Sequence, residues 1–191
     1  MFSDNKFLTL AKQPIIGQHI YIRMAEKSDY PQFFAVRRAN QQFLQPFEPI
    51  WAANALSKKV FYARVRNDQH EAGQDRKYGF LIFENTSKTL VGGVNINNVQ
   101  RGVFQACSLG YWMAESQNSK GYMTEAVTLI TDKCFKIWGF NRVQAATLLG
   151  NIASIRVLEK CGFEAEGEAK RYLKINGQWQ DHRLFAKIAQ N

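Results

Sequence analysis

The chain has little that would support a disulfide framework, a metal centre or a membrane span. Its three cysteines, Cys107, Cys134 and Cys161, are odd in number and widely spaced, without a CxxC pair or a neighbouring histidine cluster. No apolar run approaches the roughly 20 residues of a transmembrane helix, and the segment MFSDNKFLTLAK lacks the apolar core of a signal peptide. These absences predict buried structural thiols, no metal ligands, no membrane partner and a cytoplasmic location.

Aromatic residues and positive charge are abundant. Apolar residues make up 46% of the 191 residues, with 14 Phe, 7 Tyr and 4 Trp, so a single domain spanning residues 1–191 is expected. Lys and Arg number 25 against 16 Asp and Glu, a net charge of +9. This surplus favours a polyphosphate cofactor or an RNA-rich particle as partner, or it serves solubility alone. No RNP-type motif, zinc finger or basic helix supports sequence-specific nucleic acid binding.

Hydrophobic periodicity predicts an α+β fold with a mixed, mostly antiparallel sheet flanked by helices. Strands are expected at Ile20–Met24, Tyr78–Glu84, Thr89–Ile96, Gln105–Met113, Arg142–Thr147, Phe163–Tyr172 and Trp179–Lys187, the last two joined by a turn at Asn176-Gly177. Helices are expected after the cap Ser28-Asp29 and at Leu56–Arg66, Glu125–Phe140 and Ser154–Cys161. Gln41–Trp51 is too broken by proline for regular structure, and the polar segment Asn67–Lys77 is predicted to be a mobile connection.

The segment Asn118–Ala126, NSKGYMTEA, joins a polar loop directly to an amphipathic helix. The first N–H groups of a helix lack intrahelical partners and lie at the positive end of its dipole, so they can bind a phosphate. Gly121 permits a tight turn, Lys120 adds a positive charge, and Ser119 and Thr124 offer hydroxyls. An ordinary solvated helix start is the alternative interpretation of this loop.

Three blocks in this order resemble the GCN5-related N-acetyltransferases (GNATs). The blocks are the strand LGYWM at Leu109–Met113, the loop NSKGYM at Asn118–Met123 and the segment NIASIRVLEKCGF at Asn151–Phe163. Across 20–187 the chain looks most like the RimJ/RimL branch, which acetylates N-terminal residues of ribosomal proteins. That likeness includes FLQPFEP, NNVQRGVFQACSLGY and YLKINGQWQDH.

The resemblance implies a GNAT fold and acetyl-CoA as donor, with CoA as product. Its pyrophosphate is expected on the loop, and its pantetheine arm is expected to pair with the sheet as an added strand. The implied cofactor-binding residues are Trp112, Met113, Asn118, Ser119, Lys120, Gly121, Tyr122, Met123, Thr124, Asn151 and Ser154. Three of them depart from the family pattern: Asn118 replaces a Gln or Arg, Ser119 a common Gly, and Met123 a small residue.

Ser154 stands where this branch places a hydroxyl near the thioester sulfur, so it is a candidate to stabilise or protonate the departing thiolate. A role as N-cap of the following helix is the alternative, and the two can coexist. The general base is open, because Arg171 stands where relatives carry an acidic residue. A water chain ending at an acidic or histidine side chain is an alternative proton route, for which the candidates are Asp181, His182, Glu166 and Glu168, with Asp181-His182 as the best pair.

Several of the candidate side chains also have a purely structural interpretation. Asp181 and His182 are also suited to fixing the last hairpin, and Tyr172, a third catalytic candidate, is also suited to half-buried packing. Arg171 either binds an acidic acceptor segment or is simply exposed. The aromatic segment with Phe43, Phe47 and Glu48 walls an acceptor cleft or, through its rings, plugs the core.

The amine's own pKa decides how much a missing base matters. An α-amine with a pKa of about 7.7–8.0 is roughly a tenth neutral at pH 7, whereas lysine near 10.4 is neutral in about one molecule per 2,500. We therefore expect acetyl transfer to a protein N-terminus, most simply that of a ribosomal protein, by direct attack in a ternary complex. A small-molecule amine acceptor, or a non-catalytic module that binds acetyl-CoA or a ribosomal particle, are the alternatives. The sequence leaves the acceptor's identity and the oligomeric state open.

Overall fold

One eight-stranded sheet forms the centre of the computed structural model, which describes residues 6–190; residues 1–5 and 191, the ends of the expected domain, lie outside the described residues. The strand order is β1-β2-β3-β4-β5-β6-β8-β7, and every neighbouring pair is antiparallel except β5–β6. The strands are β1 (Ile15–Ile16), β2 (Ile20–Met24), β3 (Tyr78–Glu84), β4 (Leu90–Gln100), β5 (Ala106–Met113), β6 (Arg142–Leu148), β7 (Glu164–Ile175) and β8 (Gln178–Ile188). The predicted mixed, mostly antiparallel sheet is confirmed.

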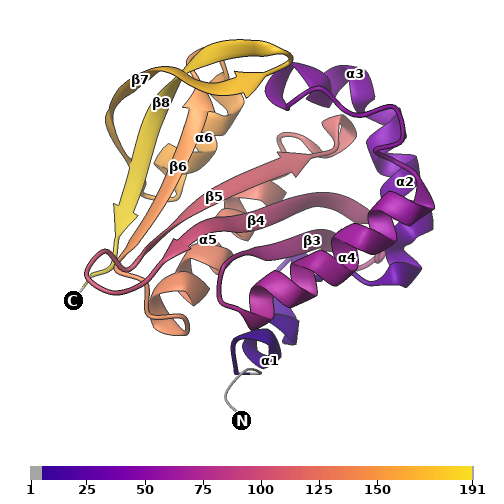
Figure 1. Cartoon of the computed structure of the whole chain (residues 1–191), viewed down its shortest axis with the longest axis horizontal. Coiled ribbons are helices and arrows are strands. Elements are labelled where there is room, and N and C mark those ends of the chain that lie inside the picture. Colours follow the sequence, from indigo (N-terminus) through magenta and orange to yellow (C-terminus); the bar gives the residue numbers. More distant parts are fainter. Residues whose placement is uncertain (1–5, 191) are drawn as a thin grey trace.

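Helices cover both faces of this sheet (Figure 1). They are α1 (Lys6–Lys12), α2 (Tyr30–Ala39), α3 (Gln41–Leu44), α4 (Lys58–Gly73), α5 (Tyr122–Lys136) and α6 (Ile152–Lys160), with 3-10 turns η1 (Lys27–Asp29), η2 (Gln45–Phe47) and η3 (Glu115–Gln117). α5 and α6 pack on one face, and α2 and α4 pack on the other. Neither α1 nor β1 was predicted, because both segments are short and depend on packing against α4 and β2.

Strand β3 shows why the sheet is covered on both sides. Its sequence YGFLIFE is buried from Tyr78 through Phe83. Successive side chains point to opposite faces, so Phe80 and Ile82 join the core under α5, while Leu81 and Phe83 join the core under α2 and α4. A continuous apolar run of this length is therefore the signature of a strand between two helical layers.

The prediction that Asn67–Lys77 is a mobile connection is wrong. Helix α4 continues through Gly73 instead of ending near Arg66, and it carries Asp68 into the interior, where the side chain is only 3% exposed. The Nζ atom of Lys77 lies 3.0 Å from Asp68 Oδ1, and Nε of Arg64 lies 3.5 Å from Oδ2. Asp68 can be buried as a charged side chain because it has two cationic partners, a feature that composition does not reveal.

Smaller corrections concern the ends of elements. Gln41–Trp51, predicted to lack regular structure, contains the short helices α3 and η2, with Pro46 in the first turn of η2, where its missing N–H costs little. Helix α5 ends at Lys136, before the predicted Phe140, so Ile137 leaves the expected apolar face and is 53% exposed.

The three cysteines are free and buried, as predicted for structural thiols. Within residues 6–190, no helix combines the length and apolarity needed to cross a bilayer.

Replacing Asp68 tests the corrected assignment of α4. We expect Asp68→Ala to lower the free energy of unfolding by about 2–3 kcal/mol, because a buried, charge-assisted hydrogen-bond acceptor is lost. The exposed neighbour Asn67 provides the control, and Asn67→Ala should stay within about 0.5 kcal/mol of the wild type. Urea denaturation measures both. Equal, small effects at the two positions would mean that this part of the chain is not packed.

Candidate active site

The sheet opens between its two parallel strands. β5 and β6 pair from Ala106↔Arg142 to Leu109↔Ala145 and then separate, while β6 continues to pair with β8 as far as Leu148 (Figure 1). The backbone N–H of Ala114 donates to Val91 in β4 at 2.9 Å. Because backbone groups alternate along a strand, the N–H and C=O groups of Tyr111 and Met113 face the opening. This strand edge can accept an extended arm by strand addition.

At one end of the opening, the predicted loop forms the start of α5. Gly121 is the N-cap residue with φ 82°, and the first helical hydrogen bond runs from Glu125 N to Gly121 O at 3.0 Å. Glycine cannot cap with a side chain, so the N–H groups of Tyr122, Met123 and Thr124 remain available to an anion. Ser119, which stands where the family usually has Gly, also has a positive φ of 63°.

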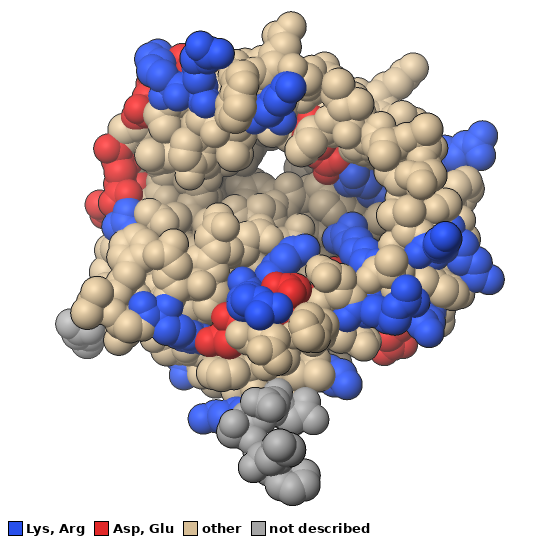
Figure 2. All heavy atoms as spheres, viewed as in Figure 1, with Lys and Arg blue, Asp and Glu red and all other residues tan. Residues whose placement is uncertain are grey.

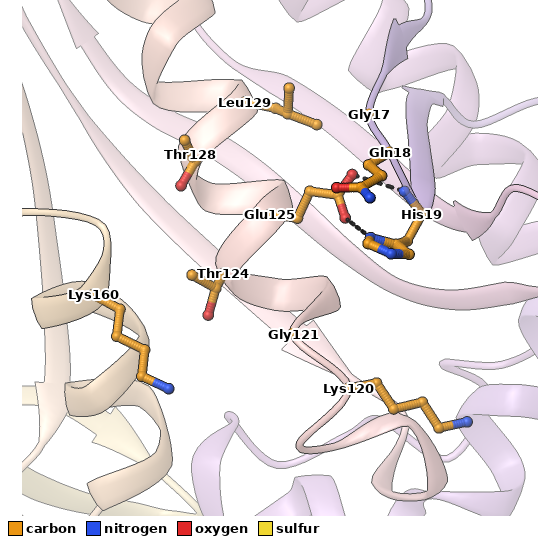
Figure 3. Close-up of a pocket in the computed structure, with 10 residues that line it drawn as sticks. All are labelled: Gly17, Gln18, His19, Lys120, Gly121, Thr124, Glu125, Thr128, Leu129 and Lys160. Atoms are coloured by element: carbon orange, nitrogen blue, oxygen red, sulfur yellow. Dashed lines mark hydrogen bonds and ion pairs between the residues drawn. The ribbon is translucent and has the colours of Figure 1, made fainter.

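Two clefts adjoin this helix start. One, of about 450 Å³, is lined by the loop together with Arg156 and Lys160 of α6. The other, of about 530 Å³, lies between the loop and the β1–β2 turn (Figure 3). In Figure 3 Lys120 and Lys160 lie on opposite sides of Thr124, and His19 contacts Glu125 through its backbone N–H at 3.0 Å and Nδ1 at 3.1 Å. The region therefore combines helix N–H groups with cationic side chains, which suits a polyphosphate.

A third cleft, of about 260 Å³, lies at the opening and contains Ser154. Its lining residues come from four parts of the chain: Phe43, Leu44, Phe47, Glu48, Tyr111, Trp112, Met113, Asn118, Met123, Asn151, Ala153, Ser154 and Val157. Figure 2 shows a hollow in the middle of this face, surrounded mostly by tan atoms, with red and blue atoms close to its right-hand edge. The structure thus brings together most of the expected cofactor residues and the aromatic wall.

Ser154 does not cap α6. The helix begins at Ile152, and its N-cap is Asn151, whose Oδ1 accepts from Ser154 N at 3.1 Å. The predicted helix start at Ser154 and its alternative N-cap role are therefore wrong. The Ser154 hydroxyl instead lies 2.8 Å from the hydroxyl of Tyr111, a residue that sequence reasoning did not single out. Burial raises the pKa of Tyr111, so this phenol stays protonated and can donate. The strand pattern LGYWM could have indicated Tyr111, because successive side chains of a strand alternate and Tyr111 therefore points to the opposite face of the sheet from Trp112.

The other catalytic candidates lie outside this cleft. Asp181 lines a separate groove of about 630 Å³ with Pro46, Phe47, Leu148, Leu149, Gly150, Asn151, Trp179 and Gln180. It accepts from Lys170 Nζ at 2.9 Å and from Arg171 N at 2.8 Å, and these partners hold the pKa of Asp181 below its usual value. Such a carboxylate is a weak base. Arg171 has φ 49° within a bulge of β7.

The neighbours of Asp181 also have structural contacts. His182 is buried and its Nδ1 lies 3.0 Å from Gln180 O, while the ring of Tyr172, 46% exposed, lies 5.7 Å from the His182 ring. Glu166 pairs with Arg142, and Glu168 pairs with Arg183 at 3.4 Å. The structure therefore places these four side chains on the β7–β8 hairpin, and none of them lines the Ser154 cleft.

A sheet opened at a parallel pair, with an anion-binding helix start beside the opening, is the architecture of an acyltransferase that uses coenzyme A thioesters. The chain belongs to the GNAT acetyltransferases: residues 19–164 match the family described as "Acetyltransferase (GNAT) domain". Acetyl-CoA is thus its acetyl donor, as expected, and the helix start and free strand edge fit the pyrophosphate and pantetheine arm.

Similar proteins cover nearly the whole chain. A probable N-acetyltransferase of Bacillus subtilis (strain 168), YjcK, is 35% identical over 89% of this chain and 94% of its own length. The [ribosomal protein uS5]-alanine N-acetyltransferase of Escherichia coli (strain K12) is 33% identical over 92% of this chain and 90% of its own. The solved structure of Mycobacterium smegmatis RimJ with CoA-disulfide superposes with a TM-score of 0.85, at 30% identity, over 89% of this chain and 82% of that one.

Gly121 allows a direct test of the anion site. An added Cβ would meet no atom within 4 Å, so Gly121→Ala acts only through the positive φ of 82°. We expect Gly121→Ala to weaken CoA binding about tenfold, because the left-handed conformation costs a non-glycine residue roughly 1–2 kcal/mol. Ser119→Gly is the matched control and should bind CoA at least as tightly as the wild type. Isothermal titration calorimetry with CoA measures both, and unchanged affinity of Gly121→Ala would place the pyrophosphate elsewhere.

Proposed function

We propose that the whole chain, residues 1–191, acts in the cytoplasm as one enzyme that acetylates the N-terminal α-amine of a protein, specifically a ribosomal protein. The observation that carries this proposal is the groove beside the Ser154 cleft. Phe47 and Asn151 line both spaces, so the cleft of about 260 Å³ and the open groove of about 630 Å³ are neighbours. An extended chain end can lie in the groove with its amine in the cleft.

The name of the E. coli relative supports the choice of acceptor, since that protein acetylates an alanine of ribosomal protein uS5. The net charge of +9 also suits a substrate found on RNA-rich particles. The proposed acceptor surface consists of Phe43, Phe47 and Glu48 on one side and the β7–β8 hairpin, with Arg171, on the other. Contact between Asn176 N and Glu48 O, at 2.9 Å, joins these two sides.

Acetyl-CoA, when bound, supplies a thioester that an amine can attack. In the proposed mechanism, the N–H groups of Tyr122, Met123 and Thr124 bind its phosphates, and the free edge of β5 at Tyr111 and Met113 orients its arm. The amine attacks directly, without a covalent enzyme intermediate. Ser154 gives its proton to the departing sulfur, the Tyr111 hydroxyl, 2.8 Å away, stabilises the serine oxygen by donating a hydrogen bond to it, and the proton that the amine releases to water restores the serine hydroxyl.

The bases available also favour an α-amine. Asp181 is tied to Lys170 and its pKa is lowered, so it is poorly suited to remove a proton from a lysine side chain. An α-amine needs no strong base, because about a tenth of it is already neutral at pH 7. In this proposal Asp181, which lines the groove, holds the β7 bulge through its contact with the Arg171 N–H, and water carries away the amine's proton.

A substrate panel tests the proposed acceptor. Peptides that begin with Ala or Ser should be acetylated at the N-terminus, and the same peptides with a blocked α-amine and an internal lysine should react at least about 100-fold more slowly, since the pKa gap alone is worth roughly 2.5 units. Mass spectrometry locates the acetyl group. Turnover of polyamines or free amino acids, with none of the peptides, would replace the protein acceptor by a small molecule. CoA binding without turnover of any amine would indicate a non-catalytic module.

Removal of two hydroxyls tests the proton relay. We expect Ser154→Ala to lower kcat by roughly 100-fold or more, since one general acid typically contributes about 10²–10⁴-fold, with affinity for CoA unchanged. Tyr111→Phe should lower kcat in the same direction and add little to Ser154→Ala, because the two hydroxyls act in series. Ser108→Ala removes a hydroxyl farther along β5 and is the control. Steady-state kinetics measures kcat, and calorimetric titration measures the affinity for CoA. A wild-type kcat for Ser154→Ala would show that Ser154 takes no part in the chemical step.

A further inference from the structure

Glu48 holds an unusual position in the cleft of about 260 Å³. Among the described residues that line it, Glu48 is the one carboxylate, and the remainder are apolar or neutral polar side chains. An amine in water at neutral pH is mostly an ammonium ion, and a charge that enters an apolar cleft requires a partner. Glu48 is the one negatively charged side chain in that lining which can provide it.

The Glu48 carboxylate is held in place on three sides. Arg37 donates from Nη1 to Oε1 at 2.8 Å and from Nη2 to Oε2 at 2.5 Å, and Trp51 donates from Nε1 to Oε2 at 2.7 Å. Two carboxylate oxygens offer about four lone-pair positions, so roughly one position, on Oε1, remains for another donor. The bidentate pairing fixes the direction in which that position points.

Arg37 is itself fixed between two indole rings. Its Cζ lies 4.2 Å from the ring centroid of Trp51 and 4.7 Å from that of Trp112 in β5. The Arg37 side chain is only 11% exposed, against 21% for Glu48. Arg37 of α2, Glu48 and Trp51 after η2, and Trp112 of β5 therefore form one contact group, and the Glu48 carboxylate is its more exposed end.

Stability alone gives little reason to keep this arrangement. Desolvation of a buried ion pair offsets most of its attraction, and well-packed apolar residues often stabilise as much. A pair with one end buried between aromatic rings and the other lining the site instead fits a positioned binding group.

We propose that Arg37 and Trp51 are positioning residues that hold Glu48 as the binding group for the acceptor's ammonium nitrogen. This inference depends on the proposed function in one respect, namely that the cleft receives the acceptor amine. The ammonium ion donates an N–H to the remaining position on Oε1 and is thereby held in the cleft that contains Ser154. It then loses a proton to water and reacts as the free amine.

The test changes first one donor to the carboxylate and then the carboxylate itself. Trp51→Phe keeps a ring over Arg37 but deletes the Nε1–H donor, and Glu48→Gln keeps the shape of the side chain but deletes its charge. Hydrogen bonds to charged groups are worth enough that we expect Trp51→Phe to raise the acceptor KM about tenfold and Glu48→Gln to raise it further. The KM for acetyl-CoA, and kcat at saturating acceptor, should change less than about twofold, since binding rather than chemistry is affected.

A control separates positioning from general loss of stability. Trp138→Phe shrinks another buried indole, one that contacts Tyr78 and Phe80 in the core under α5, and should lower Tm without raising the acceptor KM. In the Glu48→Gln background, Trp51→Phe should have no further effect on KM, because the carboxylate that it positions is gone. Additive effects of the two changes, or an equal rise in the KM for acetyl-CoA, would overturn the positioning role.

The assay is run with an Ala-initiated peptide and with a small primary amine, so that the two proposals fail separately. If the wild type acetylates only the small amine, the protein acceptor is wrong, and the rise in KM expected for Glu48→Gln is measured with that amine. If peptides are acetylated but Glu48→Gln leaves their KM unchanged, the proposed function stands and the ammonium-binding role of Glu48 is overturned.

Discussion

The separation of β5 from β6 is the constraint on which the rest of the structure depends. Beyond Leu109 and Ala145 each strand keeps one partner, β4 or β8, and gives up the other. Glycine in β4 fits this geometry: a Cβ at Gly93 would lie 2.5 Å from Trp112 Nε1, so only glycine lets that indole lie so close to the neighbouring strand. The opening thus has a wall of tightly packed backbone and a free edge of hydrogen-bonding groups.

The carboxylates near the opening form ion pairs, and these pairs limit which groups are free to accept a proton or bind a ligand. Asp181 is paired with Lys170, and Glu48 with Arg37. These partners fix the direction of both carboxylates, and the lowered pKa of Asp181 makes that group a poor base. The N-terminus of α5 differs, because its positive end has no capping side chain. If the phosphates bind at this helix start, as proposed, they are recognised mainly by backbone N–H groups, and Asn118, Ser119 and Met123 can depart from the family pattern while the turn itself is kept.

The sequence was sufficient to predict features that depend on neighbouring residues, but not those that depend on contacts between distant parts of the chain. The loop at Gly121 and the turn at Asn176-Gly177 were found because each carries its own conformational signal, a positive φ in the structure. Asp68 was misjudged because its burial depends on Lys77 and Arg64, which no periodicity reveals. Tyr111 was missed because its partner lies 43 residues away. Arg37 lies in α2, the helix expected after Ser28-Asp29, but its contact with two indoles follows only from tertiary packing.

On the proposed function, the choice of amine is made by acidity as well as by shape. A site that holds its carboxylates in ion pairs must accept a nucleophile that is already partly neutral. The α-amine and the lysine side chain differ by about 2.5 pKa units, roughly 3 kcal/mol of deprotonation at a common pH. A cleft with Ser154 and Tyr111 can assist the departing sulfur equally for both amines. The two amines therefore differ only in the pKa of the nitrogen. A site without a strong base favours the amine of lower pKa, which is the α-amine of a chain terminus.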